Sequence, residues 1–368
     1  MGVSRSLNIA QVLPPGGSSW GELGYDTLRR GVGGRETAVL KLAEQWALAG
    51  HKVTCFVPRQ TSARYLMGDG EVQLVPQEAA LHVLAASIFD AVVAWECPRY
   101  LGAVPEGTLR IVGMQVAHLI EDFDPSVVDR YVCLSPWAAD FLAEQSNIDR
   151  NMIDTVPNGI SLERFQVDFQ APEHPRCVYT SSPDRGLHHM MRLWPTLNRQ
   201  LFGGAGEFVV GYGARRWMNS NVRWSHNLQA DVVAQLEEGF KQTGVTDAGL
   251  LGQDELAKLQ LGATLMTYSC DTMQPTETGC ITVCEGFAAR LPVVTTACDC
   301  LESEYRDVTE MIDLPFDDQA FIDACGRALE PTRRKELQDT AYEFVKERTW
   351  EKTSRAWMDV LAGQTVTS

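Results

Sequence analysis

Residues 275–294 read PTETGCITVCEGFAARLPVV and connect two short apolar stretches, 263–268 and 292–296, which have the length and composition of buried strands. Between these stretches the pattern predicts a helix over 279–289, which ends before Pro292 because proline cannot continue a helix. A strand, a helix and a second strand in succession predict a right-handed βαβ unit of a parallel sheet.

The same alternation continues in both directions along the chain. Further strands are expected at 7–12, 53–57, 72–75, 91–94, 110–114, 131–134, 155–157, 177–181, 207–211 and 245–251. Helices are expected at 36–49, 79–86, 136–145, 187–198, 231–243, 254–261, 318–329 and through most of 333–361. Since strands that alternate with helices form parallel sheets covered on both faces, the predicted fold class is α/β, with doubly wound, Rossmann-like domains.

The length of 368 residues suits two domains, and the alternation restarts after 168–175, a stretch with two prolines and little periodicity. We therefore expect an N-terminal domain over 1–168 and a C-terminal domain over 169–349. Ligands of such sheets bind at the carboxyl ends of the strands, so we expect the two domains to face each other across one ligand cleft.

Composition and charge exclude several classes of partner. Lys and Arg number 32 against 48 Asp and Glu, which gives a net charge of −16, so general nucleic-acid binding is not expected. Membrane association is not supported, because no stretch has the roughly 20 uninterrupted apolar residues of a membrane span. Residues 1–6 lead directly into a strand, so a secretory signal is not expected. The ten cysteines form no Cys-x-x-Cys pair, which favours the reducing cytoplasm.

Two carboxylates in the opening stretch are candidates for ligand binding. Glu277 lies in the loop after a predicted strand, and Glu285 lies two turns inside the predicted helix. Eight residues at about 100° each bring Glu285 back within about 80° of the azimuth of Glu277, so both side chains can face one pocket. The free amides of residues 279–281 would favour an anion between them. This arrangement suits a phosphate-linked ligand that is rich in hydroxyl groups.

Three other positions carry candidate chemistry. Arg185 stands where a predicted strand turns into a helix, and its guanidinium could hold a diphosphate through two hydrogen bonds. Gly33 and Gly34 belong to a glycine-rich turn that opens a helix, where the backbone can approach a phosphate closely. This turn fails the dinucleotide fingerprint because Glu36 replaces the last glycine, which disfavours a Rossmann oxidoreductase. His118 follows the predicted strand 110–114 and could bind a sugar hydroxyl.

Together these residues resemble the retaining glycosyltransferases of the GT-B fold, in the large family 4. The resemblance spans most of the chain. It lies in Gly33-Gly34-Arg35-Glu36 with the following helix, in GHKVT (50–54), in VPNGISLERF (156–165), in Arg185-Gly186-Leu187 and, most specifically, in the Glu277-x7-Glu285 pair.

The resemblance implies transfer of a sugar from a nucleotide-diphosphate sugar to a hydroxyl of a glycan or another acceptor, with no metal or other cofactor. Gly33 and Gly34 would approach the donor diphosphate, and Arg185 would neutralise it. The resemblance further implies that the final helix, within 350–368, crosses back to the N-terminal domain, with Trp350 and Trp357 as packing anchors.

The other roles concern the donor's sugar and ribose. Glu277 would contact the hydroxyls of the donor sugar, Glu285 would hold the ribose, and His118 would lie near the reaction centre. The amides of Gly279, Cys280 and Ile281 would lie beside Glu277.

The sequence departs from the family pattern at Thr180, where such enzymes usually carry an arginine. Neighbouring hydroxyls, or Arg215 or Arg216, are candidates to replace its charge. Asp122-Phe123-Asp124 fits the Asp-x-Asp string of metal-dependent transferases and keeps that alternative open. A sugar-nucleotide epimerase of the same fold and a non-catalytic protein that binds nucleotide sugars or glycans are the alternative functions.

Overall fold

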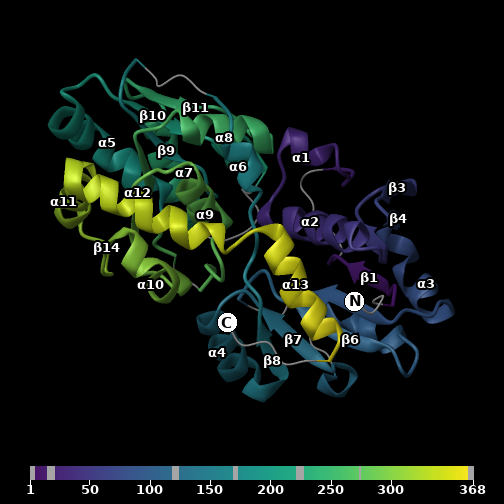
Figure 1. Cartoon of the computed structure of the whole chain (residues 1–368). Helices are drawn as coiled ribbons and strands as arrows, with labels where there is room; N and C mark the ends of the chain where they lie inside the picture. Colours follow the sequence, from purple (N-terminus) through teal and green to yellow (C-terminus); the bar gives the residue numbers. More distant parts are fainter. Residues whose placement is uncertain are drawn as a thin grey trace. The chain divides into compact units, whose positions relative to one another are not determined.

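The computed structural model describes residues 5–14, 21–117, 124–168, 173–220, 228–272 and 275–363. The chain divides into two compact units. The N-terminal unit comprises Met1–Leu28, Val32–Gly159 and Trp350–Ser368, and the C-terminal unit comprises Arg29–Gly31 and Ile160–Thr349. Figure 1 shows both units, with labels on most of their helices and strands.

In the described part of the N-terminal unit, eight strands form one sheet in the order β3-β4-β2-β1-β5-β6-β7-β8. All neighbours pair in parallel except β3 and β4, which are antiparallel. The strands are β1 (Asn8–Val12), β2 (Lys52–Val57), β3 (Ala63–Met67), β4 (Gly70–Pro76), β5 (Ala91–Trp95), β6 (Leu109–Gly113), β7 (Arg130–Cys133) and β8 (Ile153–Thr155). The helices are α1 (Thr27–Arg30), which spans the division between the units, α2 (Gly34–Leu48), α3 (Ala80–Ala86), α4 (Pro136–Ser146) and α13 (Trp350–Leu361).

The last helix belongs to the N-terminal unit although it follows the C-terminal unit in sequence. Figure 1 shows α13, in yellow, beside α2, in purple, and the two helices are in contact. Trp357 is 2% exposed, and its ring lies 5.9 Å from that of Trp46 and 5.5 Å from that of Trp95. These aromatic contacts attach α13 to α2 and to the end of β5, because large buried rings contribute much of a core's stability.

The described part of the C-terminal unit holds a fully parallel six-stranded sheet in the order β11-β10-β9-β12-β13-β14. The strands are β9 (Arg176–Tyr179), β10 (Glu207–Val210), β11 (Val245–Asp247), β12 (Leu265–Tyr268), β13 (Val293–Thr296) and β14 (Glu310–Ile312). The helices are α5 (Leu187–Phe202), α6 (Ala214–Ser220), α7 (Leu228–Gly239), α8 (Gln253–Leu261), α9 (Ile281–Ala288), α10 (Cys300–Tyr305), α11 (Asp318–Leu329) and α12 (Pro331–Lys346).

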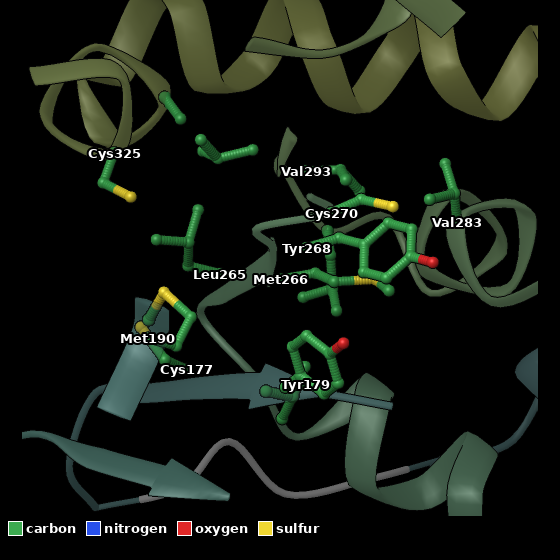
Figure 2. Close-up of a cluster of buried hydrophobic side chains, with 14 of the residues drawn as sticks. Cys177, Tyr179, Met190, Leu265, Met266, Tyr268, Cys270, Val283, Val293 and Cys325 are labelled. Carbon is green, nitrogen blue, oxygen red and sulfur yellow. The ribbon is translucent and has the colours of Figure 1, made fainter. Parts of the chain in front are cut away.

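The two central strands of the C-terminal sheet, β9 and β12, contribute side chains to the core of that unit. Figure 2 shows Cys177 and Tyr179 of β9 with Leu265, Met266 and Tyr268 of β12 in one buried cluster. Because β9 lies between β10 and β12, the strand order reverses direction there, and the carboxyl ends of β9 and β12 form the topological switch point.

The predicted fold class, with two doubly wound parallel-sheet domains, is confirmed, whereas several local predictions are wrong. The helix expected from residue 279 begins at Ile281, and the strand expected over 245–251 ends at Asp247. The antiparallel edge strand β3 was not expected. Its residues alternate between half-buried and exposed, and its sequence has no continuous apolar stretch that would indicate a buried strand.

The division between the units falls after Gly159, earlier than the linker proposed at 168–175. Ile160 donates its amide to the carbonyl of Arg348 at 2.9 Å, and Phe165 packs into the core of the C-terminal unit. The segment from residue 160 is therefore part of that unit. All ten cysteines lie among the described residues, each as a buried free thiol. Within those residues, no helix has the length and apolar character needed to span a bilayer.

We predict that Trp357→Ala lowers the free energy of unfolding of the N-terminal unit by about 3–5 kcal/mol, because it leaves a cavity between α13 and α2. Chemical denaturation followed by circular dichroism measures this loss. The exposed Arg355→Ala on the same helix is the matched control and should change stability by about 0.5 kcal/mol or less. Equal stability of the two variants would show that α13 does not depend on this contact.

Candidate functional site

The candidate site lies in the loops that follow β9 and β12, at the switch point of the C-terminal sheet. Gly186, in the loop after β9, packs directly against Ser269 in the loop after β12. Its φ is +88°, and a Cβ there would collide with the carbonyl oxygen of Ser269, so only glycine fits. The Ser269 hydroxyl donates to the Gly186 carbonyl at 2.7 Å. This close approach holds Arg185, the preceding residue, against the loop after β12.

Arg185 and Glu277 form an ion pair between their Nη1 and Oε1 atoms. The Glu277 side chain is 4% exposed, whereas that of Arg185 is 25% exposed. The Tyr268 hydroxyl donates to the same Oε1 at 2.5 Å. Burial raises the pKa of Tyr268 well above its usual value, so the phenol keeps its proton and serves as a donor. The buried carboxylate thus accepts from two donors, of which the guanidinium is the more exposed.

A third loop fixes the backbone around Glu277. Oδ2 of Asp299 accepts the amides of Thr276 and Glu277 at 2.8 and 2.9 Å, and the amide of Cys300 donates to the Glu277 carbonyl at 3.2 Å. Asp299 has a φ of +52°, which is uncommon for a residue other than glycine. Such backbone strain often accompanies functional sites. These bonds keep the segment before α9 out of helical geometry.

Glu285 has a different cation. It lies on α9, where Oε1 accepts Nη2 of Arg164 at 2.8 Å, and Nη1 of Arg164 donates to the Gln253 carbonyl at 2.9 Å. Both side chains of this pair are nearly buried. Because Glu277 precedes the helix, the predicted alignment of Glu277 with Glu285 by helical periodicity is wrong.

The amides expected to attract an anion lie between the two carboxylates in sequence. Cys280 is the N-cap of α9, so the first helical amide is that of Ile281, while Gly279 and Cys280 precede the helix. Within the described residues, no hydrogen-bond partner is recorded for these three amides. Amides at a helix start favour negative charge, so they stay candidates for an anion seat.

Thr180 does not supply a free polar group in place of the missing arginine. Its side chain is 4% exposed, its hydroxyl accepts Nε2 of Gln260 at 3.3 Å, and its carbonyl accepts the Thr282 hydroxyl at 3.0 Å. Arg215 lies on α6 with its guanidinium 5.6 Å from the centre of the Phe240 ring. The Thr180 position therefore adds no cation in this structure, and Arg215 and Arg216 stay candidates for that role.

In the N-terminal unit, Gly34 begins α2 and Gly33 is its extended N-cap. The next residue, Arg35, forms an ion pair with Glu96 at 3.0 Å. Glu96 is fully buried, has a φ of +54° and accepts the amide of Gln115 at 2.8 Å. Burial raises its pKa, although the Arg35 charge opposes that shift. The glycine turn is thereby tied to the carboxyl ends of β5 and β6.

Two sequence-predicted features cannot be placed. His118, expected near the reaction centre, lies outside the described residues, as do Asp122 and Phe123 of the Asp-x-Asp string. Among the residues that are described, no group of three or more His, Cys, Asp or Glu side chains could hold a metal ion.

Sequence reasoning did not identify three residues that complete the site: Tyr268, Asp299 and Arg164. Tyr268 reads as the apolar end of a strand, and Asp299 is one of many acidic loop residues. Arg164 lies within the quoted VPNGISLERF stretch, but nothing in that pattern indicates its partner 121 residues later. Their contacts span nine residues for Tyr268, 22 and 23 for Asp299 and 121 for Arg164, and none of them follows from a local sequence pattern.

Comparison with known proteins identifies the fold. No family model matches the sequence, and neither does any curated protein. Solved structures do match along nearly the whole chain. A sucrose-phosphate synthase from Thermosynechococcus elongatus is 15% identical, with 97% of this chain and 100% of that chain covered and a TM-score of 0.68.

Two further structures agree with the first. AviGT4, a glycosyltransferase involved in avilamycin A biosynthesis, is 18% identical over 98% of this chain and 100% of its own, with a TM-score of 0.68. An alpha,alpha-trehalose-phosphate synthase (UDP-forming) from Burkholderia vietnamiensis is 11% identical over 97% of both chains, with a TM-score of 0.69. The protein therefore has the GT-B fold, built from two Rossmann-like parallel-sheet domains.

Proposed function

We propose that this protein is a glycosyltransferase that moves a sugar from a nucleoside-diphosphate sugar to an acceptor hydroxyl, with retention of the anomeric configuration and without a metal. The observation that carries the proposal is the Arg185–Glu277 pair at the switch point of the C-terminal sheet, in a chain of the GT-B fold. The similar structures are a glycosyltransferase, a sucrose-phosphate synthase and a trehalose-phosphate synthase, and the last of these is UDP-forming, which favours a uridine donor.

The electrostatics of the pair suit the departure of a diphosphate. As the bond from the anomeric carbon to the diphosphate oxygen breaks, negative charge grows on the leaving group and positive charge on the sugar. The guanidinium of Arg185, with the amides of Gly279, Cys280 and Ile281, would stabilise the first. Glu277 would bind the sugar hydroxyls. The acceptor oxygen bonds to the anomeric carbon, and its proton passes to the departing diphosphate.

The other expected residues keep supporting roles in this proposal. Glu285 would accept hydrogen bonds from the ribose, with Arg164 holding its carboxylate in one orientation. Gly33 and Gly34 are candidates for backbone contacts to the donor, and His118 is a candidate for the reaction centre. Because a cation and backbone amides already meet the charge of the diphosphate, a divalent metal is not required.

A thermal-shift screen against UDP-, GDP- and ADP-sugars tests the donor, since a ligand that binds the folded protein raises its melting temperature. An assay for released nucleoside diphosphate, with and without candidate acceptors, then tests transfer. We expect acceptor-dependent release that survives EDTA. Conversion of the donor to its epimer without an acceptor would support an epimerase, and binding without turnover would support a non-catalytic binding protein.

We predict that Arg185→Ala and Glu277→Ala each reduce kcat by about 10²-fold or more, the usual effect of losing one group that stabilises developing charge. Arg199→Ala on α5 and Glu237→Ala on α7, both exposed, are the matched controls and should retain the wild-type rate. Rates near wild type in either site variant would contradict the assignment.

A second prediction concerns the Arg164–Glu285 pair. Arg164→Met leaves a nearly buried carboxylate without its cation, so we expect the free energy of unfolding to fall by about 3–5 kcal/mol. Adding Glu285→Gln should recover most of that loss, because the remaining side chain is neutral. Urea denaturation of the two single variants and the double variant measures the coupling, and strictly additive losses would refute it.

A further inference from the structure

Tyr268 has a polar contact that its place in the core does not require. Its side chain is fully buried, with its ring 5.8 Å from that of Tyr179, and Figure 2 shows it among the apolar side chains of the central strands. A phenylalanine would fill the same space. The hydroxyl nevertheless reaches Oε1 of Glu277 at 2.5 Å and accepts the Ser181 hydroxyl at 3.3 Å.

The oxygen that Tyr268 contacts is the one that also binds Arg185. Glu277 is almost completely buried, so its carboxylate depends on donors from the protein. Arg185 is the more exposed partner, with 25% of its side chain exposed against 4% for Glu277, so it is the member of the pair that is available to an anion. An anion at Arg185 therefore competes with Glu277 for the same guanidinium.

This competition has an energetic consequence. A buried carboxylate that loses its cation without another donor is strongly unfavourable, and that cost would oppose binding of the diphosphate. A second donor to the same oxygen reduces the cost, and Tyr268 is placed to supply it. Burial keeps the phenol protonated, as this role requires.

We propose that Tyr268 is a positioning residue for Glu277: its hydroxyl holds the carboxylate in place when Arg185 turns from Glu277 to the diphosphate of the donor. In the free protein Arg185 is paired with Glu277. In the complex Arg185 binds the diphosphate, and the Tyr268 hydroxyl remains as a donor to the Glu277 carboxylate. The inference rests on the proposed function, because it assumes that the anion at Arg185 is the donor's diphosphate.

The test measures UDP affinity by isothermal titration calorimetry in the wild type, Tyr268→Phe, Glu277→Gln and the double variant. Tyr268→Phe should weaken UDP binding about tenfold, the scale of one hydrogen bond to a charged group. Glu277→Gln should bind UDP at least as tightly as the wild type, because Arg185 is released. In that background Tyr268→Phe should change affinity less than twofold.

Tyr305→Phe is the matched control. Tyr305 is also a buried tyrosine of the C-terminal unit, but its hydroxyl lies 3.6 Å from the Cys284 sulfur and contacts neither Arg185 nor Glu277. Its removal should leave UDP affinity within twofold of the wild type. An equal loss in both tyrosine variants would assign the effect to general destabilisation and overturn the inference.

The remaining outcomes separate this inference from the proposed function. If the wild type binds UDP and Tyr268→Phe binds it equally well, the inference alone is overturned. It is also overturned if Tyr268→Phe lowers UDP affinity by the same factor in the wild-type and the Glu277→Gln backgrounds. No binding of UDP, GDP or ADP by the wild type overturns the proposed function and the inference together. If Tyr268→Phe does not fold, Glu277→Gln still tests the competition: its affinity for inorganic pyrophosphate should rise severalfold, and a fall would contradict the account.

Discussion

The ion pair between Arg185 and Glu277 is the interaction on which the account of this protein depends. Glu277 is almost fully buried, so it needs compensating donors, and Arg185 and Tyr268 supply them at one oxygen. The pair exists because β9 and β12 are neighbours in the sheet although their sequences lie far apart. Gly186 then allows the two following loops to touch. The order of the strands, the glycine at 186 and the burial of Glu277 together bring about the Arg185–Glu277 ion pair.

The N-terminal unit also contains a buried carboxylate that is paired with an arginine. Its sheet order reverses between β1 and β5, and the buried Glu96 follows β5 directly. Arg35, just inside α2, pairs with Glu96, as Arg185 pairs with Glu277 in the other unit. Both carboxylates are held beside unusual backbone, at Glu96 itself and at Asp299. Such constraints place charged groups where a parallel sheet offers its ligand site.

The sequence was sufficient for the fold because its buried strands are short apolar stretches between turns, as at β5 and β12. It was insufficient where a contact joins distant segments. Arg185 and Glu277 were each identified as candidates, but their pairing was not predicted. Tyr268 and Arg164 were not identified at all, because neither strand periodicity nor a local motif reveals a partner. The predicted start of α9 was two residues early, because Cys280 has extended backbone geometry and is the N-cap of the helix.

The most direct measurement is the difference in affinity between UDP and uridine, determined by calorimetry for the wild type and for Arg185→Ala. The two ligands differ only in the diphosphate, so the difference isolates the group that Arg185 is proposed to bind. The account predicts that the variant binds uridine as the wild type does but loses most of the additional affinity for UDP. An undiminished preference for UDP in the variant would contradict it.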